Sequence, residues 1–118
     1  MPIREHEFSR IGLLAELPGE RLRLLSDRMR RHQIPAGAEV LQEGDEGERF
    51  FVVLSGMLSV TQDTRGAVAV LKPGDYFGEV ALTMDVPRTA SIRALTPSVV
   101  ASCDRETFDE FLRPLFSD

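Results

Sequence analysis

Cysteine is nearly missing from this chain of 118 residues, and its scarcity excludes two classes of protein. The one cysteine, Cys103, has no partner for an internal disulfide. It also cannot hold an iron–sulfur cluster, because such a cluster needs several cysteine ligands. The sequence therefore predicts neither a disulfide framework nor an iron–sulfur protein.

Long apolar runs are missing as well. No segment approaches the roughly 18 apolar residues that a membrane helix needs, and the N-terminus lacks the apolar core of a secretory signal. We therefore expect no membrane contact by this chain and a cytoplasmic location.

Positive charge is in deficit, with 14 Lys and Arg against 19 Asp and Glu and a formal net charge of -5. Nucleic-acid binders need a broad basic surface, so direct nucleic-acid binding is not expected. Arginines do crowd one expected helix and could face a partner, but Glu20 and Asp27 interrupt them, which favours a solvated face. These arginines are Arg21, Arg23, Arg28, Arg30 and Arg31.

The length suits one domain over residues 1–118, and two short helices are expected in residues 5–30. Phe8, Ile11 and Leu14 recur at helical spacing, and a second set does so after the break at Pro18. The second set is Leu22, Leu25 and Met29.

Short strands are expected next, over residues 31–103. Turn signals recur about every ten residues, which is typical of a β-sandwich or barrel. The apolar runs between them are residues 40–41, 50–54, 57–60, 68–71, 91–95 and 99–103. We assign Gly44, Gly47, Gly56 and Gly74 to turns or close packing rather than to ligand contact.

A last short helix is expected over residues 104–113. Asp104 can cap its free amides, and Phe108, Phe111 and Leu112 share one apolar face with Leu115. Pro114 should then weaken any continuation of the helix.

Residues 77–94 hold the most distinctive chemistry of the chain. Arg88 offers a planar cation for a phosphate, and the amides of a turn at Gly78 can point at the same anion. Glu79 lies at the mouth of that turn, where a carboxylate would repel a phosphate unless it accepts a hydrogen bond from a ribose hydroxyl. The alternative is an ordinary Glu79–Arg88 ion pair beside a tight turn.

The segment resembles the phosphate-binding cassette of the cyclic nucleotide-binding domain family. The matching residues are Phe77, Gly78, Glu79, Val80, Ala81, Leu82, Arg88, Thr89 and Ala90. A second signature of the family, VLQEGDEGERFFVVLSG, spans residues 40–56 with its glycines in place. The resemblance covers the chain from about Leu13 to Leu112, with both signatures in the family's order.

The resemblance implies a mostly β fold, an eight-stranded jelly-roll β-barrel with two short N-terminal helices and a short C-terminal helix. It implies that Arg88 holds the cyclic phosphate and that Glu79 accepts from the ribose 2'-hydroxyl. The same match gives main-chain contacts to Gly78, Val80, Ala81, Thr89 and Ala90. Val60 and Val70 are possible walls for the base, with core packing as the other interpretation.

The ligand implied is cAMP, with cGMP as the second candidate. Thr89 carries a hydroxyl directly after Arg88, which in the family is compatible with guanine recognition, although other members with a hydroxyl there respond to adenine nucleotides. No further cofactor is expected.

The implied function is a regulatory module that relays ligand binding to an effector by hinge motion of the C-terminal helix. Family members usually add a longer lid helix, which residues 1–118 do not contain, so we expect a fragment of a larger regulator or a lid from a partner. The alternative is a ligand-free scaffold of the same fold that binds proteins.

Catalytic signatures are missing. A metal enzyme of barrel fold needs clustered His and carboxylate ligands, whereas only His6 and His32 are present, both expected outside the barrel interior. Serine nucleophile motifs and triphosphate-binding loops are also absent. We therefore predict no catalytic residue and no metal ligand.

Overall fold

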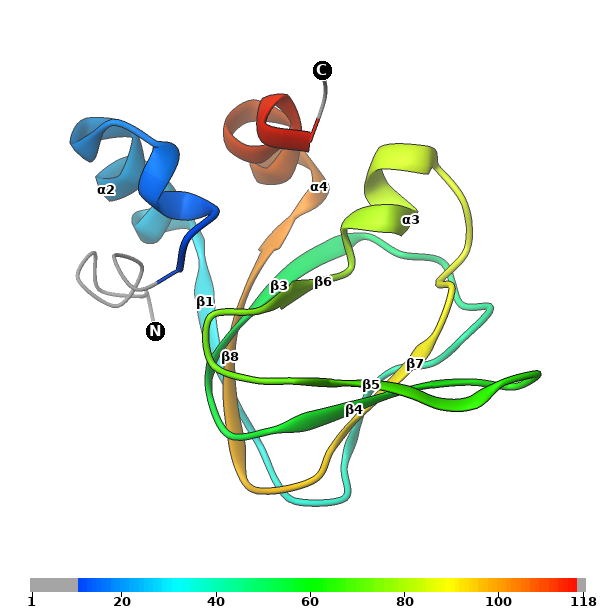
Figure 1. The fold of residues 1–118 in the computed structure, drawn as a ribbon. Coiled ribbons are helices and arrows are strands. Elements are labelled where there is room, and N and C mark those ends of the chain that lie inside the picture. Colours follow the sequence, from blue (N-terminus) through cyan, green and yellow to red (C-terminus); the bar gives the residue numbers. More distant parts are fainter. Residues whose placement is uncertain (1–10, 117–118) are drawn as a thin grey trace.

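The computed structural model describes residues 11–116, which form two β-sheets and two groups of short helices (Figure 1). The helical segments are η1 (Leu14–Glu16), α2 (Gly19–Arg28), α3 (Glu79–Met84), α4 (Arg105–Thr107), η2 (Phe108–Leu112) and η3 (Arg113–Phe116). The strands are β1 (Arg30–Ile34), β2 (Glu39–Leu41), β3 (Arg49–Ser55), β4 (Leu58–Gln62), β5 (Gly66–Leu71), β6 (Tyr76–Phe77), β7 (Ser91–Ala94) and β8 (Ser98–Asp104). Across these residues no helix combines the length and the apolar character that a membrane crossing requires.

Each sheet has four antiparallel strands, in the orders β1-β8-β3-β6 and β2-β7-β4-β5. The mostly β fold expected from the sequence is therefore confirmed. The predicted apolar runs overlap six of these strands, whereas no run was predicted at β1 or β6. β1 reads Arg-Arg-His-Gln-Ile and lies at the edge of its sheet, so it carries no buried apolar stripe.

The N-terminal helices differ from expectation at both ends. Around Leu14 the chain forms a single 3-10 turn, and Phe8 lies outside the described residues. Helix α2 ends at Arg28, and Met29 is already extended at φ -97° and ψ 153°. Arg30 and Arg31 therefore lie on β1 rather than on the helix, and the predicted basic helix face loses two of its members.

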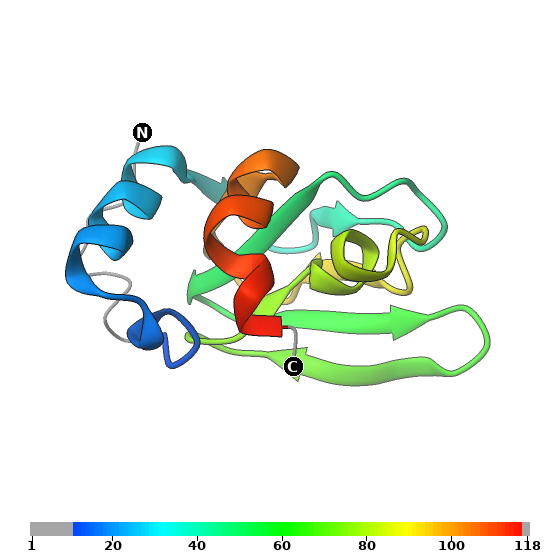
Figure 2. The same ribbon diagram turned by 90° about the horizontal axis from the view of Figure 1, so that it is seen from above.

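The first sheet, β1-β8-β3-β6, packs helices against one face. Phe50 and Val52 of β3 and Cys103 of β8 form a buried cluster with side chains of α2 and of the C-terminal helical segment. Because successive side chains of a strand point to opposite faces, Phe51 and Val53 instead face the second sheet. In Figure 2 the segment from α4 to η3 lies between α2 and α3.

The C-terminal helical segment begins as predicted. The carboxylate of Asp104 accepts a hydrogen bond from the amide of Thr107 at 2.8 Å, and Phe108, Phe111 and Leu112 are buried. The segment then passes through a π-helical turn and a 3-10 turn that runs to Phe116, so Pro114 does not end it. Proline fits there because it stands in the first turn of the new 3-10 segment, where its fixed φ is compatible and an amide donor is not required.

Candidate functional site

Gly78 sets the geometry of the segment predicted to bind an anion. It joins β6 to α3 with φ 93°, a left-handed conformation that side chains other than glycine rarely adopt. A Cβ atom at this position would lie 2.9 Å from the carbonyl oxygen of Arg49 and 3.0 Å from Nη1 of Arg88. Glycine is therefore required both by the backbone angle and by the space beside Arg88.

Arg88 is buried, with 6% of its surface exposed, and its guanidinium is held by main-chain oxygens. Nη1 donates to the carbonyl of Gly78 at 3.0 Å, and Nη2 donates to the carbonyl of Arg49 at 2.8 Å. Burial lowers the pKa of Arg88, while Glu48 and Glu79 oppose that change, and an arginine stays charged under such conditions. The structure thus holds a fixed cation with donor capacity to spare.

The two sequence signatures meet at Gly47. A Cβ atom on Gly47 would lie 2.6 Å from Cβ of Ala81 and 2.8 Å from Cζ of Arg88. Glycine at this position lets the loop between β2 and β3 pack directly on the arginine, which is the close-packing role that the sequence suggested.

Glu79 supplies an unsatisfied acceptor next to this cation. Its Oε2 atom is buried and has no hydrogen-bond partner among the described residues. Burial raises the pKa of Glu79, opposed by a hydrogen bond to its own backbone and by the charge of Arg88. The hydrogen bonds of Arg88 go to main-chain oxygens, so the alternative of an ordinary Glu79–Arg88 pair does not account for Oε2.

A cavity of about 160 Å³ brings these groups together. Its lining includes the seven residues predicted to bind the ligand, namely Gly78, Glu79, Val80, Ala81, Arg88, Thr89 and Ala90, and also Val60. Pockets that enclose a drug-sized molecule usually measure about 300–1,000 Å³, so this cavity can enclose only part of a nucleotide. A buried cation, an unsatisfied carboxylate and nearby amides suit the anionic and hydroxyl-bearing part.

Comparison with known proteins agrees with this chemistry. The family model described as the cyclic nucleotide-binding domain matches residues 31–114. The chain belongs to the cyclic nucleotide-binding domain family. The resemblance seen in the two sequence signatures is therefore confirmed.

Individual relatives within the cyclic nucleotide-binding domain family include kinases and kinase subunits. The chain is 35% identical over 104 residues to a cAMP-dependent protein kinase regulatory subunit of Debaryomyces hansenii, covering 88% of this chain and 23% of that protein. It is 36% identical over 114 residues to the cGMP-dependent protein kinase egl-4 of Caenorhabditis briggsae, covering 92% of this chain and 15% of that protein. The chain thus spans less than a quarter of either relative.

A solved structure has the same fold. The structure of cAMP-bound PfPKA-R superposes with a TM-score of 0.90 at 29% identity, covering 94% of this chain and 39% of that chain. Two antiparallel sheets and a C-terminal helix are therefore shared with a solved member of the cyclic nucleotide-binding domain family.

The structure does not bring Val70 to the cavity, which corrects one sequence prediction. Val70 pairs with Ser59, one residue away from Val60, so alternation places it on the opposite face of the second sheet. It is 45% exposed there, whereas Val60 lines the cavity.

Four lining residues of the cyclic nucleotide-binding domain were not predicted as site residues. They are Leu41, Tyr76, Phe77 and Ile92. Phe77 stood inside the family pattern and could have been found there. Leu41 and Ile92 reach the cavity because β2 and β7 pair with Leu41 opposite Ile92, a contact between distant segments that a strand pattern does not reveal.

Two arginines join α3 to the C-terminal helical segment. Nη1 of Arg105 and Nη2 of Arg113 both donate to the carbonyl of Leu82, at 3.5 and 2.8 Å. Arg105 also contacts Glu48 at 3.2 Å and Asp85 at 3.6 Å. Helix α3, whose first three residues line the cavity, is thus hydrogen-bonded through Leu82 to the helical segment that follows β8.

Proposed function

We propose that this chain is a regulatory module that binds cAMP in the cavity lined by Glu79 and Arg88. One observation carries the proposal: a carboxylate oxygen that is buried without a partner stands in the same cavity as a buried, fixed guanidinium. A cyclic nucleotide offers an anion to Arg88 and a 2'-hydroxyl donor to Oε2 of Glu79. An ordinary Glu79–Arg88 ion pair would not require a buried carboxylate oxygen without a partner.

Arg88 is proposed to hold the cyclic phosphate. Its guanidinium is already positioned by the carbonyls of Gly78 and Arg49, so little side-chain freedom is lost when the anion binds. Main-chain amides near Gly78, Val80, Ala81, Thr89 and Ala90 complete the contacts in this proposal, since all five residues line the cavity.

Adenine is the proposed base, with guanine as the second candidate. The fungal relative is named as cAMP-dependent and the nematode relative as cGMP-dependent, at nearly equal identity, so their names support both. The solved relative carries cAMP, which favours the first. The Thr89 hydroxyl is the group that could contact a guanine, because it lies exposed at the cavity.

Relay to an effector is proposed to run through the carbonyl of Leu82. This carbonyl accepts from Arg105 and Arg113, so a shift of α3 on ligand binding would change the position of the C-terminal helical segment. The two sheets are proposed to be the halves of the eight-stranded jelly roll of the family, in a single domain over residues 1–118. The proposed effector is a partner protein or an attached domain.

Titration calorimetry with cAMP and cGMP tests the proposal. We expect saturable binding of one cyclic nucleotide per chain, with cAMP binding more tightly than cGMP. Arg88→Ala should weaken binding at least about a hundredfold, because hydrogen bonds to a charged group contribute about 1.5–3 kcal/mol each. The matched control is Arg65→Ala, which removes an exposed arginine outside the cavity. Absence of heat and of thermal stabilisation at high ligand excess would favour the ligand-free scaffold.

Glu79→Ala distinguishes the contribution of the ribose contact to binding from that of the phosphate contact. It should weaken cAMP binding strongly while changing the affinity for 2'-deoxy-cAMP little, since that analogue cannot donate to Oε2. Equal losses for both ligands would remove Glu79 from the ribose role. Thr89→Ala tests the base in the same way, and an unchanged cGMP affinity would show that the hydroxyl is not read.

A further inference from the structure

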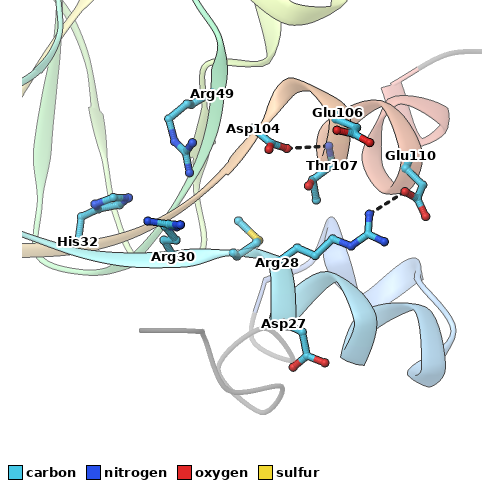
Figure 3. Close-up of a pocket in the computed structure, with 10 residues that line it drawn as sticks. Asp27, Arg28, Arg30, His32, Arg49, Asp104, Glu106, Thr107 and Glu110 are labelled. Carbon is cyan, nitrogen blue, oxygen red and sulfur yellow. Dashed lines mark hydrogen bonds and ion pairs between the residues drawn. The ribbon is translucent and has the colours of Figure 1, made fainter.

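A second, larger concavity lies outside the nucleotide cavity. This groove, of about 1060 Å³, opens between α2, the start of β1 and the α4–η2 turn (Figure 3). The two lining sets have no residue in common, so the groove is separate from the cavity of Glu79 and Arg88. The side chains that line it have no part in the proposed nucleotide binding.

Three basic side chains converge at one end of the groove. Arg30 and His32 come from β1 and Arg49 comes from β3, and all three share one face of the first sheet with Ser102 of β8. Nε of Arg49 donates to Oγ of Ser102 at 3.0 Å, and Nε2 of His32 lies 2.7 Å from the same oxygen. Ser102 is fully buried, so a rigid group fixes two of the three.

None of these three side chains forms an ion pair among the described residues, although Asp104 lies opposite Arg49 in the β3–β8 register, where hydrogen bonds from Thr107 and the charge of Arg49 lower its pKa. Over residues 11–116 the side chain of Arg30 makes no hydrogen bond or ion pair, and the Nη atoms of Arg49 make none. The acids of the groove are engaged elsewhere or stand at its other end. Glu110 pairs with Arg28 at 2.7 Å, and Asp104 caps the amide of Thr107. Figure 3 shows Arg30, His32 and Arg49 together and apart from the Arg28–Glu110 pair.

We propose that Arg30, His32 and Arg49 form a binding site for a phosphate monoester. Two guanidinium groups offer planar pairs of donors that match phosphate oxygens, and an imidazole adds a third donor. A dianion with three terminal oxygens can use all three groups, whereas a carboxylate has one charge and two oxygens. The phosphate can belong to a small molecule or to a phosphorylated side chain, because both present the same group.

Arg49 places this site in contact with the nucleotide cavity. Its side chain lines the groove, while its carbonyl oxygen accepts from Nη2 of Arg88 at 2.8 Å. One residue therefore contributes to both sites through different atoms. Phosphate binding itself does not depend on cyclic nucleotide binding, so the two proposals fail separately.

NMR on the full chain tests the proposal with inorganic phosphate and with a blocked Ala-phosphoserine-Ala peptide. We expect saturable shifts of the Arg30 and Arg49 Nε signals and of the His32 ring. The unphosphorylated peptide should cause none. Equal affinity for the two probes indicates a free phosphate ligand, and tighter binding of the peptide indicates a phosphorylated polypeptide. Absence of saturable shifts with both probes overturns the proposal.

Four arginine variants locate the phosphate. Arg30→Gln and Arg49→Gln should each weaken binding about tenfold, since one charge-assisted contact is lost. Arg65→Gln, an exposed arginine of the β4–β5 turn, should change nothing. Arg88→Gln should leave the shifts in the groove intact. Full affinity in both groove variants, or loss of binding in Arg88→Gln alone, contradicts the proposal. Should Arg49→Gln fail to fold without its Ser102 contact, the affinity of Arg30→Gln decides between the two outcomes.

Sulfate, which remains a dianion near neutral pH, provides a second readout. Burial lowers the pKa of His32, and Arg49 and Arg30 lower it further, so the ring is mostly neutral at pH 7. Bound sulfate should raise this pKa, and sulfate should bind more tightly as the pH falls through it. Asp27, Asp104 and Glu106 also line the groove, and their negative charges oppose binding of the anion. A His32 pKa that does not move at saturating sulfate contradicts its role.

Discussion

The two sheets differ in what covers them, and the difference separates stability from binding. The first sheet buries one face under α2 and the C-terminal helical segment, whose side chains join Phe50 and Val52 in a single cluster. The second sheet has no such cover among the described helices (Figure 1). The residues of its edge strand β5 are exposed along nearly its whole length. The buried cluster between the first sheet and its helices contains more side chains than the cluster between the two sheets, so it makes the larger hydrophobic contribution to stability.

The nucleotide cavity lies at the junction of these unequal halves. The second sheet supplies its apolar wall with Leu41, Val60 and Ile92, whereas Arg88 is anchored by the carbonyl of Arg49 on the first sheet. A ligand in this cavity therefore contacts both the helix-covered first sheet and the less covered second sheet.

Among the variants that test this difference, Phe50→Ala should cause the largest loss of stability. Phe50 is fully buried, and its ring lies 5.3 Å from Phe108 and 5.9 Å from Tyr76 between centroids. Its loss should lower the free energy of unfolding by about 3–5 kcal/mol. Val70→Ala, on the exposed face of the second sheet, should stay within about 0.5 kcal/mol. Urea unfolding measures both, and similar losses would contradict the comparison.

Gly78→Ala tests the junction itself. The substitution meets an unfavourable φ and a carbonyl oxygen 2.9 Å from the new Cβ, so it should cost about 2–3 kcal/mol. Gly37→Ala is a matched control, because Gly37 has φ 85° with no atom within 4 Å of a Cβ. That control should cost only about 1 kcal/mol for the backbone angle. Equal losses on thermal unfolding would show that crowding at Gly78 is unimportant.

The sequence predicted the parts of the site that lie close together along the chain. Glu79 and Arg88 were found because both belong to one short segment with interpretable chemistry. Val70 was misplaced because the face of a strand residue depends on its register with β4, where a bulge between Val60 and Thr61 shifts the pairing. The groove cations were hidden because Arg30 directly follows a helical pattern, and because β1 and β3 are far apart in sequence.

The fold was predicted in a similar way, with apolar strands recognised and polar ones missed. Runs such as residues 50–54 are buried on both faces and therefore read as strands directly. β1 carries charge and forms through pairing with β8, which depends on tertiary contacts alone. The π-helical turn after α4 has no sequence pattern that reasoning from helical spacing could detect.

Arg113→Gln should weaken the link between α3 and the helices over the first sheet. It removes the 2.8 Å hydrogen bond to the carbonyl of Leu82 and the ion pair with Asp109 at 2.8 Å. We expect a loss of about 1 kcal/mol and faster amide exchange in α3, because the bond joins a charged donor to a partly buried oxygen. Asp109→Asn is the control, since it weakens the ion pair alone and should leave exchange in α3 unchanged. Equal exchange in both variants would contradict a link through Leu82.

Glu79→Gln should change the stability of the protein least, and the informative measurement is how that change depends on pH. Because burial raises the pKa of Glu79 in the folded state, the ionised carboxylate destabilises the ligand-free protein above that pKa, and the cost disappears as pH falls towards the unfolded value. The variant should therefore melt at a higher temperature than the wild type at pH 7. Its free energy of unfolding should rise by less than about 1 kcal/mol, because the amide also lacks a partner. The advantage should shrink by pH 4. Glu46→Gln, an exposed change of the same charge, should show no such trend, and a constant difference for Glu79→Gln would contradict the buried carboxylate.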